Sequence, residues 1–337
     1  MDRLTEWLLD VAGPIIRYRI LAELLDDASI SRSRLLEEVL ATEEVKKWLG
    51  NLGGHKIHGS TDTHAENALA KCLEYGLTAK VPEFDEKAHK YCDIAPGGRF
   101  SSQTDRLVLL PFLVRAGYSG EEAVDKVLRE CLSKLHRTAA ANRYDFFRTP
   151  DESNRLPKPW ADKRVYKDVF SPVTGQLPVP TCYEFYALCS YRTSNPRLRT
   201  MIDDVVYFVS QPEFQSITGS IYGWDEKKRQ AWAGGEAFIA RAVEPDRLIM
   251  FMELASPFES ARASYWFKEG LRRLERFRTP RGSYRFPVEY LMERPNRYYL
   301  YRGAHMGLGE NRRSRHALEI ESTFRMLRIM KRMKSDN

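Results

Sequence analysis

The chain has 337 residues, of which 43% are hydrophobic and 12% aromatic, and its mean hydropathy is -0.49. This composition is typical of folded globular proteins and excludes the disordered, collagen-like and fibrous classes. The net charge of +7 is concentrated in residues 246–337, which hold 20 Lys and Arg against 11 Asp and Glu. There is no run of about 18 uncharged apolar residues and no signal-peptide pattern, so we expect a cytoplasmic protein without integral membrane association.

The cysteines do not predict a disulfide framework or a zinc ribbon, because none of them forms a CxxC pair and their number is odd. Most of them stand at apolar positions of predicted helices. We therefore expect reduced, buried thiols at Cys72, Cys92, Cys131, Cys182 and Cys189.

The N-terminal part of the chain predicts one helical hairpin, with helices over residues 7–25 and 35–49. An internal repeat follows, in which residues 58–77 align without gaps with residues 99–118, at an offset of 41. Each copy predicts a polar turn and an apolar helix that ends at a glycine in the left-handed conformation. The matched positions include Leu69 with Leu110 and Gly76 with Gly117.

The rest of the chain predicts further helical hairpins. Residues 119–135 form the partner helix of the second copy, introduced by a capping box from Ser119 to Glu122. Other helices are predicted over residues 181–191, 196–209 and 246–254, from residue 256 onward, and from about residue 316 to 333. Strand-like alternation is almost absent. Three glutamates each stand three residues after Ser or Thr, and we interpret them as structural capping residues: Glu66, Glu184 and Glu259.

The two helices of each well-formed hairpin differ in pattern. The first is apolar nearly all round, as expected of an inner layer, and the second has one apolar stripe, as expected of an outer layer. Two concentric layers favour a closed ring over an open solenoid. We therefore predict an all-α protein, with a single α/α-toroid domain over residues 1–337 built from five or six hairpins.

Three segments resemble the α/α-toroid repeats of the prenyltransferase and squalene/terpene cyclase superfamily: GPIIRYRILAELL (13–25), GSTDTHAENALAKCLEYGL (59–77) and the Gly-Ser-Tyr turn at Gly282. The resemblance implies a central cavity for an apolar or diphosphate-bearing small molecule. In this turn Tyr284 stands where the cyclases have tryptophan, which makes it a candidate substrate-binding residue. The chain has no Asp-x-Asp-Asp cluster, which argues against triterpene cyclisation.

The loop from His58 to His64 is a candidate metal site. Its Asp62 and His64 resemble part of the zinc ligand set of protein prenyltransferase β subunits, and His305 or Cys182 could complete the set from another repeat. The alternative is a plain helix start, in which Asp62 interacts favourably with the N-terminal end of the helix dipole.

A glycine- and aromatic-rich loop before the helix at 246–254 carries candidate substrate-binding and catalytic residues. Tyr222, Trp224 and Trp232 offer faces that stabilise a cation or stack on a sugar ring. Asp225 and Glu236 are candidates for an acid and a base, as in the paired carboxylates of glycosidases. The alternative is that these rings pack the turns between helices.

Residues 303–315 form a glycine-rich basic loop before the closing helix. Its backbone amides, together with Arg312 and Arg313, suit a phosphate or carboxylate group. The alternative is a connector whose arginines pair with nearby carboxylates, namely Glu310, Glu319 or Glu321.

The function favoured by this sequence is a toroid with an aromatic-lined cavity that binds an apolar or diphosphate-bearing small molecule, with or without transforming it. Two alternatives stay open: a noncatalytic helical scaffold with a basic partner-binding face, and a carbohydrate-active (α/α) barrel. Nucleic-acid binding is not expected, because the basic C-terminal residues are interleaved with acidic ones and no nucleic-acid module is recognisable. An open cavity would favour a ligand, whereas a filled centre would favour the scaffold.

Overall fold

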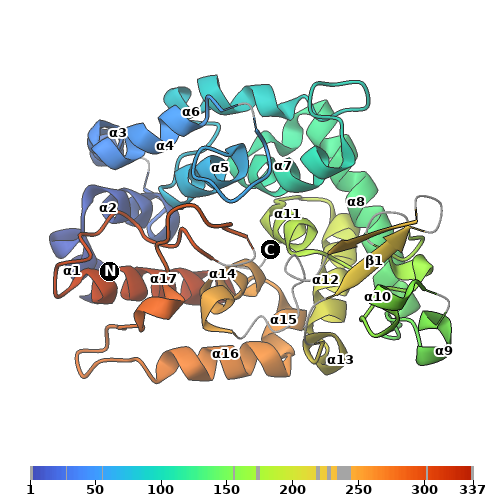
Figure 1. Cartoon of the computed structure of the whole chain (residues 1–337). Helices are drawn as coiled ribbons and strands as arrows, with labels where there is room; N and C mark the ends of the chain where they lie inside the picture. The colour runs from blue at the N-terminus through green and yellow to red at the C-terminus, as the bar shows by residue number, and fades with distance from the viewer. Residues whose placement is uncertain are drawn as a thin grey trace.

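The structure is a computed structural model that describes residues 3–27, 29–54, 56–154, 156–171, 175–217, 221–225, 229–233, 244–300 and 303–334. Helices predominate in these residues (Figure 1), and their strands form one two-stranded sheet. The all-α prediction is therefore confirmed. None of the described helices is both long enough and apolar enough to cross a membrane.

The N-terminal hairpin is more broken than the sequence predicts. Its first half consists of α1 (Arg3–Val11), α2 (Pro14–Arg19) and the π-helical turn η1 (Ile20–Leu24), and its second half of α3 (Ile30–Ala41) and α4 (Glu43–Asn51). Pro14 begins α2 because proline has no backbone N–H to continue a helix and is tolerated in the first turn. Thr42 caps α4, since its side chain accepts a hydrogen bond from the backbone N–H of Val45.

The two copies of the repeat become α5 (Ala65–Glu74) and α7 (Gln103–Ala116). After them come α6 (Pro82–Ala88) with the 3-10 turn η2 (His89–Cys92), and α8 (Glu122–Ala141). Gly76 and Gly117 have φ angles of +82° and +102°, which confirms the predicted glycine caps. The predicted capping box at Ser119 is wrong, because this residue lies in the 3-10 turn η3 (Tyr118–Gly120) and α8 begins without a side-chain cap.

Beyond α8 the described elements are α9 (Pro150–Ser153), α10 (Lys158–Ala161), η4 (Asp168–Phe170), α11 (Cys182–Ser190), α12 (Pro196–Ser210), α13 (Pro212–Gln215), β1 (Tyr222–Asp225), β2 (Gln230–Ala233), α14 (Pro245–Ala255), α15 (Glu259–Ala263), α16 (Tyr265–Glu275), η6 (Val288–Tyr290) and α17 (Ala317–Lys334). The strands β1 and β2 are antiparallel, with Gly223 opposite Trp232.

Two further capping boxes were predicted in this part of the chain. The box formed by Thr181 and Glu184 at the start of α11 is confirmed. The box at Ser256 is wrong, because its hydroxyl donates to the carbonyl of Glu253 at the end of α14, and Phe258 precedes α15 without a side-chain cap.

Five helices form the buried interior: α5, α7, α11, α14 and α17. In chain order each of them contacts the next, and α17 also contacts η1 and α1, so the last helix lies beside the first ones (Figure 1). Every residue of α5 is buried. By contrast, α8, α12 and α16 bury one face, which is the pattern predicted for outer helices.

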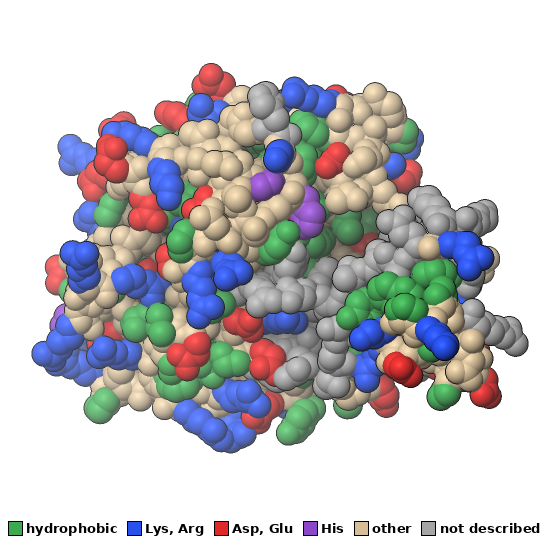
Figure 2. All heavy atoms as spheres, in the orientation of Figure 1, with side chains coloured by type: hydrophobic (Ala, Val, Ile, Leu, Met, Phe, Trp, Pro, Cys, Tyr) green, Lys and Arg blue, Asp and Glu red, His purple; other side chains and the backbone are tan. Residues whose placement is uncertain are grey.

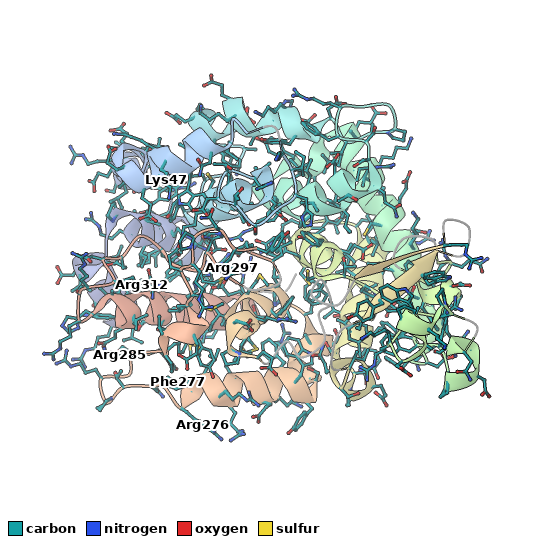
Figure 3. All side chains as sticks on the ribbon, in the orientation of Figure 1. Lys47, Arg276, Phe277, Arg285, Arg297 and Arg312 are labelled. Atoms are coloured by element: carbon teal, nitrogen blue, oxygen red, sulfur yellow. The ribbon has the colours of Figure 1, made fainter. Side chains whose placement is uncertain are left out.

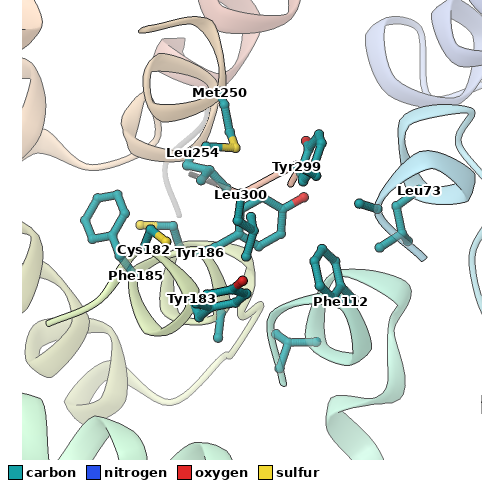
Figure 4. Packing of buried hydrophobic residues seen from close by; sticks show 14 of the residues in the cluster. Leu73, Phe112, Cys182, Tyr183, Phe185, Tyr186, Met250, Leu254, Tyr299 and Leu300 are labelled. Carbon is teal, nitrogen blue, oxygen red and sulfur yellow. The ribbon is translucent and has the colours of Figure 1, made fainter. Parts of the chain in front are cut away.

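The space between the interior helices is filled by two residues from the segment that precedes α17. Figure 4 shows Tyr299 and Leu300 between Met250 of α14, Tyr186 of α11 and Leu73 of α5. Both are buried. The Tyr299 hydroxyl donates to Glu74 Oε1 at 2.6 Å. The centre is therefore filled at this level, as the scaffold hypothesis requires.

Candidate functional site

The structure does not assemble the predicted zinc ligands. Asp62 Oδ1 lies 3.8 Å from His305 Nε2, and it accepts a hydrogen bond from the backbone N–H of Asn296 at 2.7 Å. His64 Nδ1 is in hydrogen-bond contact with the hydroxyl of Thr61, which lies in the same loop. Within the described residues no group of three His, Cys, Asp or Glu side chains is placed to hold a metal ion. The free thiol of Cys182 is buried in α11.

The predicted aromatic site lies away from the interior helices. Tyr222 is on β1, where its backbone bridges to Val165 and its ring contacts Trp160. Figure 1 shows this hairpin at the edge of the molecule, beside α10. The backbones of Asp225 and Trp232 belong to the same hairpin, which also carries Trp224, whereas Glu236 lies outside the described residues.

The remaining aromatic candidate, Tyr284, has a structural environment. It is buried, its hydroxyl donates to Glu275 Oε1 at 2.8 Å, and its backbone N–H donates to Thr323 of α17 at 2.9 Å. These bonds fasten the turn at Gly282 to α16 and α17.

The amides of the glycine-rich basic loop bind carboxylates of the chain itself. Gly307 N–H donates to Glu293 Oε2 at 2.7 Å, and Leu308 N–H donates to Glu321 Oε1 at 2.8 Å. Arg312 forms an ion pair with Glu321 at 2.5 Å, and Arg313 is exposed. The ion pair of Arg312 with Glu321 agrees with the alternative hypothesis, in which the loop is a connector whose arginines pair with nearby carboxylates.

A network of charged side chains lies in the buried interior. Arg325 of α17 donates from Nη1 to both oxygens of Glu253 at 3.0 and 3.1 Å, and from Nη2 to Glu74 Oε2 at 2.7 Å. Arg115 of α7 donates to Glu74 Oε1 at 2.8 Å. Burial opposes ionisation of Glu74, but the guanidinium groups of Arg325, Arg115 and Arg19 hold its pKa well below the usual range.

The network continues into the N-terminal helices. Glu23 of η1 pairs through Oε1 with Arg19 Nε and through Oε2 with Arg328 Nε, at 2.6 Å in each case. Arg328 also donates to Glu253 Oε2 at 2.6 Å, and Arg19 donates to the carbonyl of Glu74 at 2.7 Å. The network therefore joins the two ends of the chain.

A cavity of about 430 Å³ lies against this network, and we call it the central cavity. Its lining comes from the C-terminal ends of four interior helices, α5, α7, α11 and α14, together with α2, η1 and the second half of α17. Tyr299 belongs to the lining. Apolar walls are provided by Leu73, Val114, Met250 and Leu254.

The charge of this lining is unbalanced. Two of the described lining side chains are acidic, Glu23 and Glu253, and both are bound to Arg328. Seven are basic: Arg19, Arg32, Lys80, Arg115, Arg192, Arg328 and Arg332. Glu74 and Arg325 adjoin the lining and carry opposite charges, so together they add no net charge to it. Among the residues that the structure describes, the lining of the central cavity therefore holds more positive than negative side chains.

Two arginines of the lining, Arg19 and Arg332, are in environments that are unfavourable for a positive charge. Arg19 is fully buried, and although its Nε pairs with Glu23, its Nη2 has no hydrogen-bond partner within the described residues. Burial, followed by repulsion from Arg328 and Arg192, lowers the pKa of Arg332 to about 9. Buried positive charge is unfavourable unless it is paired.

The sequence reasoning missed these arginines, although a signal was present. Arg19, Arg115 and Arg325 each stand inside an apolar stretch of a predicted helix. A charged residue in such a position needs a buried partner. Glu23, four residues after Arg19, is a partner that the sequence offers, but Glu74 and Glu253 lie on other helices and could not be identified as partners from the sequence.

Comparison of the chain with known protein families, with curated proteins and with solved structures finds no match.

Proposed function

We propose that this protein is an α/α toroid that binds a small molecule with an anionic group in its central cavity. The ring arrangement is supported by the order of contacts, in which each interior helix packs against the next and α17 returns to η1. It is also supported by the outer helices, which bury one face. The observation that carries the function is the unbalanced positive lining of the central cavity.

The lining also indicates the class of ligand. Arginine side chains bind phosphate and carboxylate groups through charge-assisted hydrogen bonds. The apolar side chains Leu73, Val114, Met250 and Leu254 line the same cavity, so a ligand with an anionic head and an apolar part fits both. The volume of the central cavity, about 430 Å³, falls in the range of small-molecule sites. A prenyl diphosphate, the ligand class implied by the superfamily resemblance, meets this description.

Titration calorimetry with pyrophosphate and geranyl diphosphate tests this function. We expect saturable binding of both ligands, tighter for geranyl diphosphate because of the apolar walls, and weaker at high salt because charges are screened. Arg332→Gln should weaken binding of both about tenfold or more. Arg276→Gln is the matched control, because Arg276 is exposed at the end of α16 and lies outside the cavity lining (Figure 3).

The contradicting result is absence of heat at millimolar concentrations of both ligands. It would favour the scaffold hypothesis, for which the structure offers one specific observation: Tyr299 and Leu300 fill the space between the interior helices. Figure 2 shows Lys and Arg side chains interspersed with acidic ones over the lower part of the molecule, and Figure 3 places Arg276 and Arg285 in this part.

A further inference from the structure

A second cluster of titratable side chains lies at the N-terminal ends of α5 and α11, away from the central cavity. His58 Nδ1 lies 2.9 Å from Glu66 Oε1. Glu66 belongs to the first turn of α5 and is 2% exposed, whereas 36% of the His58 side chain is exposed. The prediction that Glu66 forms a capping box is wrong, because its carboxylate accepts hydrogen bonds from other groups.

Those groups fix the position of the carboxylate. Gly59 N–H donates to Glu66 Oε1 at 2.7 Å, and the hydroxyl of Tyr183, in the first turn of α11, donates to Oε2 at 2.9 Å. The His58 ring lies between two aromatic neighbours, 5.3 Å from the Tyr298 ring and 6.3 Å from the Tyr183 ring, measured between centroids. Three separate parts of the chain therefore hold one imidazole in place.

The two nitrogens of His58 have different surroundings. Nδ1 faces the buried carboxylate, so in the neutral ring the proton resides on Nδ1 and Nε2 keeps its lone pair. Within the part of the chain that the structure describes, the polar contact of the His58 ring is that of Nδ1 with Glu66, and 36% of the side chain is exposed. Two other described histidines differ from it: the carboxylate that pairs with His136 is the exposed Asp204, and His305 is fully buried.

We propose that His58 is the general base of a catalytic site, positioned by Glu66, and that Nε2 takes the proton of a water molecule or substrate hydroxyl. With an ester as the second reactant, the water O–H bond breaks as its oxygen bonds to the carbonyl carbon, and Nε2 receives the proton. The imidazolium then returns this proton to the departing alkoxide as the ester C–O bond breaks. One ester and one water give one acid and one alcohol, and His58 is restored.

The charged surroundings of His58 define how this base responds to pH. The hydrogen bond to Glu66 raises the pKa of His58, burial opposes this, and Glu66 and Asp105 of α7 add favourable charge interactions. Tyr183 and Tyr298 are the other titratable groups that face the ring. A general base is active when deprotonated, so the rate should rise with pH through the His58 pKa.

The test is the pH dependence of 4-nitrophenyl acetate hydrolysis, an activated ester that needs little recognition. We expect the wild-type rate to follow the titration of His58, observed separately by NMR, and to fall about tenfold or more in His58→Gln. Glu66→Gln should move the midpoint to lower pH, because the raising charge is removed. Tyr183→Phe should move it to higher pH, because the carboxylate loses a donor that competes with His58. His136→Gln is the control and should match the wild type.

Two results would overturn the proposal. One is a rate in His58→Gln equal to that of the wild type. The other is a folded Glu66→Gln variant in which the midpoint and the His58 titration are unchanged; if this variant does not fold, an unchanged midpoint in Tyr183→Phe serves the same purpose. Anion binding in the central cavity is measured independently, so failure of one proposal leaves the other standing.

Discussion

Arg325 is the residue on which the buried charge network depends. Its guanidinium binds Glu253 and Glu74 and also donates to the carbonyl of Met306 at 2.5 Å. All three charged side chains are buried. Removing one partner of a buried ion pair leaves the other charge uncompensated, which is much more costly than the pair itself is favourable.

We therefore expect Arg325→Met to lower the free energy of unfolding by about 3–5 kcal/mol. Chemical denaturation monitored by circular dichroism measures this change. Arg281→Met, at an exposed position, is the control and should change stability by less than about 0.5 kcal/mol. A loss below about 1 kcal/mol in Arg325→Met would show that the network is not important for stability.

The pair formed by Lys71 and Glu293 predicts a pH dependence of stability. Lys71 Nζ lies 2.7 Å from Glu293 Oε2. Burial alone would raise the carboxyl pKa, but Lys71 and His305 lower the pKa of Glu293 to about 2. Because the folded pKa is below the unfolded value, this stabilisation is complete above about pH 4.5 and is lost as the pH falls toward 2.

Glu293→Gln should therefore be less stable than the wild type at pH 7, by about 2 kcal/mol. The gap should narrow in urea denaturation at pH 4 and again at pH 3. Glu289→Gln, at an exposed carboxylate, should follow the wild type at each pH. A gap that is constant from pH 7 to pH 3 would rule out the ionic origin of the stabilisation.

The surroundings of the two glycine caps predict that alanine substitutions destabilise the protein to different extents. A Cβ at Gly117 meets nothing within 4 Å, so Gly117→Ala should cost only the strain of the left-handed backbone, about 1–2 kcal/mol. A Cβ at Gly76 would lie 3.1 Å from Arg19 Cγ and 3.2 Å from Tyr18 Cε1. Gly76→Ala should therefore lower the free energy of unfolding by more than Gly117→Ala, and equal losses would contradict the packing described at the end of α5.

Individual elements could be predicted where local chemistry determines them. The apolar helices α5 and α7, their glycine ends and the Thr181 cap follow from patterns within a few residues. The predicted boxes at Ser119 and Ser256 have the same spacing, but Ser119 lies in a 3-10 turn and Ser256 ends α14 in a helical conformation, so neither residue begins the next helix. Spacing alone does not reveal which residue begins a helix.

For the whole molecule, the two kinds of helix were easier to predict than the site. Buried and amphipathic helices leave a periodic signal in the sequence, and the structure confirms both kinds. The lining of the central cavity includes Arg19, Arg115 and Arg332, which come from three helices that are far apart in the sequence. The pairing of His58 with Glu66 was hidden for a similar reason, because the capping spacing gave Glu66 a complete local explanation.

The central claim is that the positive charge of the central cavity is unbalanced until an anion binds. Its most direct test is the free energy of unfolding of the wild type and of Arg332→Gln, each with and without pyrophosphate. We predict that Arg332→Gln is more stable than the wild type without the anion, because relief of the burial of its charge and of its repulsion with Arg328 and Arg192 outweighs the loss of its hydrogen bond to the Glu253 carbonyl. We also predict that pyrophosphate stabilises the variant less than it stabilises the wild type. A variant that is less stable without the anion, and that gains as much from pyrophosphate as the wild type does, would contradict this account.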